Sequence, residues 1–336
     1  MAARLTNKMG LSLAMAVWLA HDPYNSESQK DYVDDPDIEV VSVTTLIKPI
    51  RQFILHQRVP KEKAIIPDVA DNQAAAYGQA IHSGIENVWL NGGYKQAMRD
   101  LGYPEKLIQK MKVNPSQADL EMDYYVPVYV EQRRSKVIDG VRITGQLDLC
   151  INGEINDTKT TSVYTWINGS NEDYYRLQMS IYRWISPDWI TSDIGYIQHV
   201  FTDWSALKAR QDPSYPQSRV KELKIELMSL QETERWILQR LKDIRDNIDL
   251  EEDEMIPCPD KDLWKTETQY KYYADATKAH TPGARSTKNF TDYQQAVLHL
   301  KEAGKGTLKT VPGVVKACGY CRAFPICSQK DQYTHG

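Results

Sequence analysis

Several features that mark specialised classes of protein are missing from this sequence. Its 336 residues contain no internal repeat and no low-complexity segment. The strongest apolar run, residues 9–20, is too short to span a bilayer, and we interpret it as an N-terminal helix packed on a domain. The formal net charge is only −4, so the chain is not a polycation, and contact with nucleic acid would depend on local basic patches.

What the sequence does contain is typical of a globular protein with one large domain or two. Hydrophobic residues make up 41% of the chain and charged residues 26%. One local bias stands out: residues 278–330 carry nine Lys and Arg against two acidic residues, a balance of +7. Charge alone does not decide between a solvated basic tail and a nucleic-acid contact.

Hydrophobic periodicity predicts an α/β (α+β) fold, a small central mixed sheet flanked by helices. Helices are expected at 9–20, 43–58, 72–91, 172–186 and 219–250, the last as a long amphipathic helix. Strands are expected at 123–132, 137–151, 154–161 and 194–201. We expect three parts: an N-terminal helical segment at 1–70, a core at 71–205, and the long helix with a cysteine-rich segment at 206–336.

The strongest local signal is the dipeptide Asn152-Gly153 between two strands. Both central positions of a type I′ turn need a positive φ, which Asn and Gly tolerate best. A two-residue loop places Ile151 opposite Glu154, and this pairing sets the register of the whole hairpin.

Counting outward from that turn places Asp148 opposite Asp157 and Gln146 opposite Lys159. Side chains alternate between the faces of a strand, so Lys159 shares a face with Asp157. Directly opposed carboxylates repel each other, and hard oxygen ligands suit Mg²⁺ or Mn²⁺. The hairpin is therefore a candidate cation site, although a solvated surface ribbon would show the same short pattern.

Two helices carry further polar pairs at a spacing of four residues. His82 and Glu86 share one face of the helix at 72–91, and His82 could complete a Mn²⁺ site. Gln178 and Tyr182 share a face of the helix at 172–186, where they could bind a phosphate and stack on a base. Each pair alone would also suit an ordinary helix surface.

The cysteines form the second strong signal, because three of the five lie within ten residues. Cys318, Cys321 and Cys327 have the spacing C-x2-C-x5-C, and Cys258 is the expected fourth ligand. In a reducing compartment such spacing indicates a thiolate metal site rather than disulfides, either Zn²⁺ or an iron–sulfur cluster. Cys150, inside a strand, is expected to be a small buried side chain. The pattern argues against secretion and favours a cytoplasmic protein.

Taken in order, Gly-x3-His-x3-Glu, Gly-x2-Asp, Asp-x-Lys and Gln-x3-Tyr resemble the RecB-type branch of the PD-(D/E)xK nuclease superfamily. The resemblance covers roughly residues 75–190 and 255–330, and the N-terminal segments are similar to those of bacteriophage-encoded members. The C-x2-C-x5-C motif is similar to that of the iron–sulfur nucleases of this branch. Those proteins usually place their first cysteine ahead of the His motif, whereas here no cysteine precedes Cys150.

The resemblance implies a restriction-endonuclease-like core and a Mg²⁺- or Mn²⁺-dependent DNA exonuclease. It implies metal ligation by His82, Asp148 and Asp157, and a catalytic role for Lys159. It implies that Gln178 and Tyr182 contact DNA. It also implies that the four cysteines hold a [4Fe–4S] cluster, with Zn²⁺ as the alternative.

The implied role is cutting at DNA ends or on single strands during phage recombination or repair, inside a bacterial host cell. A phage recombination or single-strand-binding protein is an expected partner, and a membrane is not. A non-cleaving nucleic-acid-binding protein with a structural metal cluster is the alternative.

Overall fold

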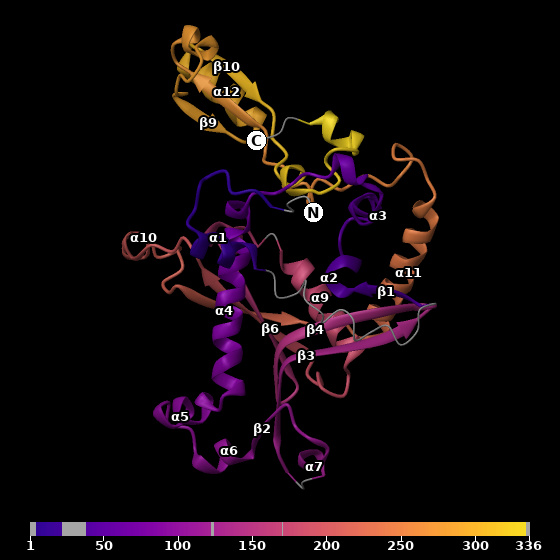
Figure 1. Ribbon diagram of the computed structural model, residues 1–336. Coiled ribbons are helices and arrows are strands. Elements are labelled where there is room, and N and C mark those ends of the chain that lie inside the picture. Colours follow the sequence, from indigo (N-terminus) through magenta and orange to yellow (C-terminus); the bar gives the residue numbers. More distant parts are fainter. Residues whose placement is uncertain (1–4, 22–37, 122–123, 170, 334–336) are drawn as a thin grey trace. The chain divides into compact units, whose positions relative to one another are not determined.

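The computed structural model describes residues 5–21, 38–121, 124–169 and 171–333, and divides into two compact units (Figure 1). The first unit comprises 1–47 and 66–242, and the second comprises 48–65 and 243–336. Among the described residues, none of the helices combines the length and the apolar character that a membrane crossing requires.

The first unit is built on a mixed seven-stranded sheet, as the sequence predicts. Its strands are β1 (Glu39–Ser42), β2 (Met111–Val113), β3 (Val126–Ile138), β4 (Val141–Ile151), β5 (Glu154–Thr161), β6 (Ile194–Phe201) and β7 (Val220–Glu226). The order is β2-β3-β4-β5-β6-β7, with β1 added parallel to β4. The pairs β2–β3 and β5–β6 are parallel and the remaining neighbours are antiparallel.

Two tight turns define the centre of this sheet. Asn152 and Gly153 have φ values of 49° and 89°, which confirms the predicted type I′ hairpin between β4 and β5. A second turn of the same kind, at Asp139 and Gly140 with φ values of 52° and 77°, joins β3 to β4. The expected strand at 137–151 was therefore wrong at its start, since its first two residues belong to β3.

Strands β4 and β5 diverge a few residues beyond their turn. Their pairing runs from Ile151 opposite Glu154 to Leu149 opposite Asn156, where it ends. From there β5 is held on its other side by β6, while β4 pairs with β3 and, over its first four residues, with β1. The expected pairing of Gln146 with Lys159 does not form, because β5 has already left β4.

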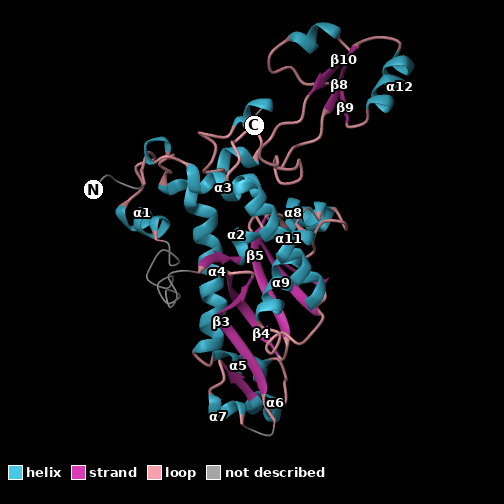
Figure 2. Ribbon diagram, turned by 90° about the vertical axis from the view of Figure 1, so that its right-hand side faces the viewer, coloured by secondary structure: helices cyan, strands magenta, loops and turns pink. Residues whose placement is uncertain are grey.

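Helices cover the sheet (Figure 2). Two helices make the main contacts with the sheet. Helix α4 (Gln73–Leu90) packs on β3 and β5, and helix α9 (Glu172–Ile185) packs on β3, β4 and β7. The remaining helices that lie wholly in this unit are α1 (Leu13–Ala20), α2 (Val43–Leu46), α5 (Gly93–Asp100), α6 (Glu105–Lys110), α7 (Gln117–Leu120), α8 (Val163–Asn168) and α10 (Ala206–Gln211).

The contact between α9 and β4 depends on a glycine. A Cβ on Gly145 would lie 2.6 Å and 2.7 Å from two ring carbons of Tyr182, closer than side chains approach in proteins. The ring of Tyr182 therefore lies against the bare backbone of β4, three residues before Asp148. This packing gives a physical reason for a glycine and a tyrosine in two distant motifs.

The predicted helix at 219–250 is wrong in its first part. Residues Val220–Glu226 form the edge strand β7, and helix α11 spans only Leu230–Ile248. The apolar residues at 223, 225 and 227 also fit a period of two, so the helical spacing was not a unique reading.

The second unit has its own small sheet and several short helices. Strands β8 (Gln269–Tyr273), β9 (Lys288–Phe290) and β10 (Thr307–Val311) form an antiparallel sheet in the order β10-β8-β9. Helix α12 (Tyr293–Ala303) packs on all three strands, and α3 (Ile50–Arg58) belongs to the same unit. The last strand expected from the sequence ends at residue 201, so this sheet was missed.

Candidate active site and cysteine cavity

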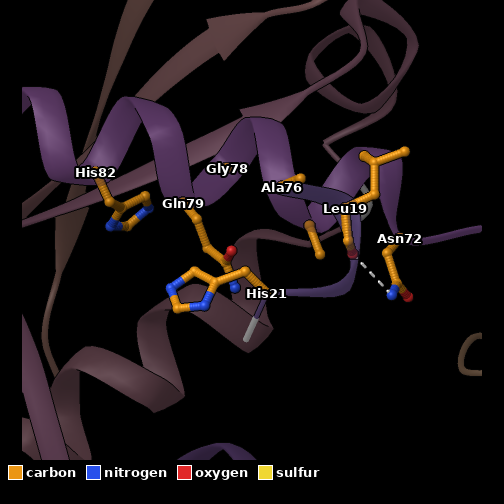
Figure 3. Close-up of a pocket in the computed structure, with 8 residues that line it drawn as sticks. Leu19, His21, Asn72, Ala76, Gly78, Gln79 and His82 are labelled. Atoms are coloured by element: carbon orange, nitrogen blue, oxygen red, sulfur yellow. Dashed lines mark hydrogen bonds between the residues drawn. The ribbon is translucent and has the colours of Figure 1, made fainter. Parts of the chain in front are cut away.

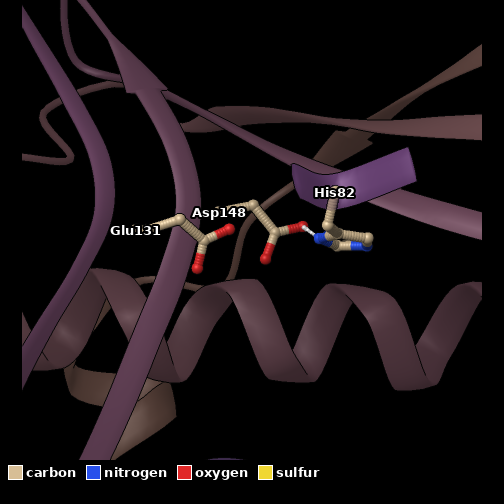
Figure 4. Close-up of side chains that lie close together, drawn as sticks. All are labelled: His82, Glu131 and Asp148. Carbon is tan, nitrogen blue, oxygen red and sulfur yellow. Dashed lines mark ion pairs between the residues drawn. The ribbon is translucent and has the colours of Figure 1, made fainter. Parts of the chain in front are cut away.

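Three ligand-type side chains converge where β4 separates from β5. An imidazole nitrogen of His82 and carboxylate oxygens of Glu131 and Asp148 all lie within 4.8 Å of one another (Figure 4). They come from α4, β3 and β4, and all three residues are half-buried. They line a cavity of about 10 Å³, which is room for one ion or water molecule.

The hydrogen bonds around His82 leave its second nitrogen facing an acid. Its Nε2 lies 2.9 Å from the carbonyl oxygen of Thr158, so the ring proton belongs on Nε2. Its Nδ1 then presents a lone pair 3.4 Å from the Asp148 carboxylate. Burial lowers the pKa of His82, which favours this neutral form. A lone pair and a carboxylate that face each other repel, and a proton or a metal ion between them relieves this repulsion. An imidazole fixed by a carbonyl is a common ligand arrangement.

The two carboxylates are also unfavourable as neighbours. Burial and the charge of Asp157 raise the pKa of Asp148 well above its ordinary value. Burial also raises the pKa of Glu131, with Glu86 adding to the effect. Two groups with raised pKa values in one cavity indicate that negative charge is uncompensated there.

Each carboxylate is nevertheless held in place by one donor. The amide N–H of Thr158 donates to Asp148 at 3.0 Å, and the side chain of Gln146 donates to Glu131 at 2.8 Å. Arg133 in turn donates to Gln146 at 2.8 Å. The acidic pair is therefore oriented by the diverging strands themselves.

Asp157 and Lys159 form a separate, tighter pair. Their charged atoms are 2.6 Å apart, and the Asp157 side chain is only 3% exposed. Burial opposes the charge of Lys159, but Asp157 and Asp148 outweigh it and raise its pKa. Lys159 is thus a fixed cation. Asp157 was expected to lie with His82 and Asp148, yet it is outside the group of three within 4.8 Å, and its role as a ligand stays a prediction.

Gln178 and Tyr182 lie next to this pair. Gln178 donates to the Tyr182 oxygen at 3.0 Å, and the Nζ of Lys159 lies 3.5 Å from the Gln178 amide oxygen. Burial raises the pKa of Tyr182, and the negative charge of Asp157 adds to this shift, so the phenol stays protonated. Gln178 and Tyr182, which helical spacing placed on one face, therefore lie beside Asp157 and Lys159 of the hairpin.

Glu131 is the site residue that the sequence reasoning missed. The Asp139-Gly140 turn sets a register in which Glu131 falls opposite Asp148. Glu131 has a φ of 50°, and the two residues interrupt the ladder between β3 and β4. Counting residue pairs outward from the Asp139-Gly140 turn, as was done from Asn152-Gly153, would have placed Glu131 opposite Asp148.

A larger pocket of about 420 Å³ adjoins His82 (Figure 3). It runs along α4 past Gly78 and Gln79 to the end of α1, where His21 projects toward the same space. The side-chain amide of Asn72 donates to the carbonyl of Leu19 at 3.1 Å and ties α1 to this wall. Such a volume is within the usual range for a small-molecule or nucleotide subsite.

In the second unit, all four expected cysteine ligands line a single cavity of about 50 Å³: Cys258, Cys318, Cys321 and Cys327. None of them forms a disulfide. Burial and the neighbouring thiols raise the pKa of Cys258 to about 12. Cys150 is buried in β4, as expected.

Two polar residues organise this cysteine cavity, and neither was singled out from the sequence. The side chain of Gln329 accepts from the Cys258 amide at 2.9 Å and donates to the Cys258 carbonyl at 2.8 Å. The Nε2 of His56 lies 3.5 Å from the sulfur of Cys321. The first cysteine is thus fastened to the segment that follows the last one.

Comparisons with known proteins show only distant likeness. No protein-family model and no curated protein matches this chain. Among solved structures, a protein named SSO0001 has a TM-score of 0.40 at 15% identity, over 71% of this chain and 87% of its own.

Two further solved structures carry nuclease names. A phage-related exonuclease from Haemophilus somnus 129PT has a TM-score of 0.27 at 18% identity, over 62% of this chain and 93% of its own. A protein named as an exonuclease from Eubacterium rectale has a TM-score of 0.29 at 13% identity, over 67% of this chain and 85% of its own. At these TM-scores the likeness carries no argument about the activity of this chain.

Proposed function

We propose that this protein is a divalent-metal-dependent deoxyribonuclease that hydrolyses phosphodiester bonds. The observation that carries the proposal is the convergence of His82, Glu131 and Asp148 on a cavity of ionic size beside the Asp157–Lys159 pair. One neutral nitrogen and two carboxylates form a donor set that suits Mn²⁺ or Mg²⁺. A bound ion would act as a Lewis acid and lower the pKa of a coordinated water.

The protein's own groups would position the substrate around that ion. Lys159, kept charged and immobile by Asp157, would stabilise the negative charge that grows on the attacked phosphate or orient the attacking water. Tyr182 keeps its proton, so its hydroxyl can donate to a phosphate oxygen. Gln178 holds both Lys159 and Tyr182, and would couple their positions.

We assign the pocket along α4 to the nucleotide next to the cleaved bond. It adjoins the His82 imidazole, and the polar side chains of Gln79 and His21 line it. Cleavage at DNA ends or on single strands is the mode implied by the sequence resemblance to RecB-type nucleases. The same resemblance implies a role in phage recombination or repair in the bacterial cytoplasm. It also implies a recombination or single-strand-binding protein as a partner.

For the cysteine cavity we propose a [4Fe–4S] cluster rather than Zn²⁺. The choice follows the resemblance of the C-x2-C-x5-C motif to that of the iron–sulfur nucleases, because Zn²⁺ accepts the same four thiolates. Gln329 and Arg51, which donates to the Met255 carbonyl at 3.2 Å, would hold the surrounding loops.

The test of the nuclease proposal is Asp148→Asn assayed on end-labelled DNA with Mg²⁺ and with Mn²⁺. Loss of cleavage by at least about 100-fold, with an unchanged fold by circular dichroism, is expected because the variant removes a ligand charge. Lys159→Ala should lose turnover but keep Mn²⁺ affinity. Full activity of Asp148→Asn at saturating metal would contradict the site, and DNA binding by the wild type without any cleavage would favour the non-cleaving alternative.

A further inference from the structure

Trp264 combines an unfavourable backbone conformation with an exposed side chain. Its φ is 49°, in the left-handed region that favours glycine, where a bulky residue is uncommon. The residue is nevertheless 56% exposed, so burial in a core does not compensate the strain. Strained residues cluster at sites that bind ligands, and the surface around Trp264 is therefore a candidate binding surface.

A second exposed aromatic ring lies beside the first. Tyr320 is 82% exposed, and its ring centroid lies 5.9 Å from that of Trp264, with the two ring planes 50° apart. Both residues belong to the second unit. We call Trp264 and Tyr320 the aromatic pair. Since both residues stay largely exposed, the pair presents flat apolar ring surface to solvent.

The backbone holds the aromatic pair in place. Tyr320 ends the short helix Ala317–Tyr320, within the C-x2-C motif. The carbonyl oxygen of Leu263, the residue before Trp264, accepts a hydrogen bond from the Lys316 amide at 3.3 Å. Leu263 itself is buried and lines the cysteine cavity. The pair is therefore part of a preformed surface, which lowers the entropic cost of binding a ligand there.

Positive charge lies on the Tyr320 side of the pair. Residues 312–330 contain three basic residues and no acidic one, whereas residues 259–267 contain two basic and three acidic residues. Lys265 is paired with Asp260 at 3.0 Å. Lys316 is exposed, and among the described residues it forms no ion pair with a carboxylate. Lys316 is therefore a cation beside the aromatic pair that a ligand can use.

This combination of side chains suits a nucleic acid strand better than a protein partner. Tyr and Trp are enriched at protein–protein interfaces, but lysine is depleted there. Aromatic rings beside a lysine are the groups with which proteins hold the bases and phosphates of a single strand. A duplex keeps the faces of its bases stacked on one another, so only an unpaired strand offers base faces to these rings.

We infer that the aromatic pair and Lys316 bind single-stranded DNA, with the rings stacking on bases and Lys316 contacting a phosphate. The choice of DNA rests on the proposed function, whereas the single-strand mode rests on the two exposed rings. This surface of the second unit is a contact with the strand in addition to the metal site of the first unit.

The experiment measures, by fluorescence anisotropy, binding of the full-length protein to fluorescein-labelled strands without added divalent metal. One probe is an oligothymidylate, and the other is an abasic strand of the same length, which keeps the phosphates but lacks the bases. The test variants are Trp264→Ala, Tyr320→Ala and Lys316→Gln. The matched controls are Tyr103→Ala and Lys106→Gln, which change exposed residues of the first unit.

Each ring variant should weaken binding of oligothymidylate at least about fivefold and leave binding of the abasic strand unchanged, because a ring acts by stacking on a base. Lys316→Gln should weaken binding of both probes and make the slope of log K against log salt about 0.7 units shallower. The controls should change neither affinity. Wild-type affinity in both ring variants would overturn the inference, as would an equal loss on the two probes or tighter binding of duplex than of single strand.

Two further variants separate loss of the contact from loss of the fold. Tyr320→Phe keeps the ring and should bind oligothymidylate as the wild type does. Trp264→Gly suits a positive φ, so it should be at least as stable to heat as Trp264→Ala and should bind oligothymidylate as weakly. Wild-type binding by Trp264→Gly would remove the indole from the surface.

Failure of the two proposals can be told apart. Metal-dependent cleavage of bis(p-nitrophenyl) phosphate, a small diester without a base, tests the metal site alone. If the wild type cleaves neither this diester nor DNA with Mn²⁺ while strand binding depends on the rings, the proposed function fails and the binding surface stands. If metal-dependent cleavage is intact while binding ignores the rings, the binding surface fails alone.

Discussion

At the scale of single residues, the acidic pair beside His82 has a cost that a cation would remove. Burial raises the pKa of Glu131, so ionising this side chain destabilises the metal-free protein as pH rises through its folded pKa. The same charge is what would attract the ion. Stability without metal and affinity for metal should therefore respond to Glu131 in opposite directions.

We expect Glu131→Gln to raise the unfolding temperature in EDTA at pH 8 and to weaken Mn²⁺ binding by at least about tenfold. Thermal unfolding and titration calorimetry measure the two effects. Glu86→Gln is the matched control, because Glu86 lines the same cavity without belonging to the group of three ligand atoms. Equal Mn²⁺ affinity of Glu131→Gln and wild type would remove Glu131 from the proposed ligands.

His199 of β6, which lies opposite Lys159 of β5, gives a prediction on pH. It is 2% exposed, and the Trp166 ring packs 5.1 Å away. Within the part of the chain that the structure describes, its Nδ1 has no hydrogen-bond partner. Burial lowers the pKa of His199, so the unfolded chain takes up the proton first as pH falls below about 6.5. Native stability is therefore present at neutral pH and is lost on acidification.

Replacing His199 by Phe should remove the part of the acid-induced loss of stability that comes from this imidazole. We expect the drop in unfolding free energy between pH 7.5 and 5.5 to be smaller in the variant, by at most about 1.4 kcal/mol per pH unit. Urea unfolding at the two pH values measures it. Parallel pH dependence in both proteins would mean that His199 is already protonated, or accessible to water, in the native state.

At the scale of elements, the site depends on how α9 lies against β4. Tyr182 covers the strand at Gly145, and the same helix carries Gln178 to the ammonium of Lys159. We expect Gly145→Ala to destabilise the protein by about 1–3 kcal/mol, because its Cβ would force the ring away. Gln178 would move with the helix, so nuclease activity should fall as well.

A double-mutant cycle with Tyr182→Ala checks this contact. The cost of Gly145→Ala in urea unfolding should shrink once the ring is gone. Gly84→Ala is the control: a Cβ there meets no atom within 4 Å, and Ala in a helix interior should stabilise by up to roughly 1 kcal/mol. A full cost of Gly145→Ala without the ring would point instead to the Val43 side chain, whose Cγ2 would lie 3.1 Å from the added Cβ.

At the scale of the whole molecule, two compact units carry different candidate chemistries. In the second, a metal centre on the four cysteines would close a loop of 60 residues between Cys258 and Cys318. Such a closure strongly restricts the unfolded chain, and metal binding becomes part of the folding free energy of that unit.

We expect protein purified without oxygen to be brown and to contain about four irons per chain. Cys258→Ser should lose metal and solubility together, while Cys150→Ser should lose neither. A colourless protein with stoichiometric zinc would eliminate the cluster but keep the cysteine site. Full metal content in Cys258→Ser would show that the fourth ligand is another residue, for which His56, beside Cys321, is the nearest candidate.

The sequence by itself determined the features that depend on local chemistry. Asn152-Gly153 required a type I′ turn, and the turn placed the first three residue pairs of the hairpin correctly. Helical spacing placed His82 on α4 and Gln178 with Tyr182 on α9. These inferences hold because φ preferences and side-chain periodicity act over a few residues.

Only the tertiary structure decided where those pieces meet. Strand β5 leaves β4 after three residue pairs, β1 pairs with the start of β4, and the separation removes Asp157 from the group formed by His82, Glu131 and Asp148. The strand at 220–226 follows from pairing with β6, since its own pattern fits a helix equally well. Cys258 was expected beside the C-terminal cysteines from the sequence, but the loops that bring it there, with His56 and Gln329, depend on contacts between residues far apart in the chain. Such contacts are selected by the packing energy of the whole unit, which no local pattern encodes.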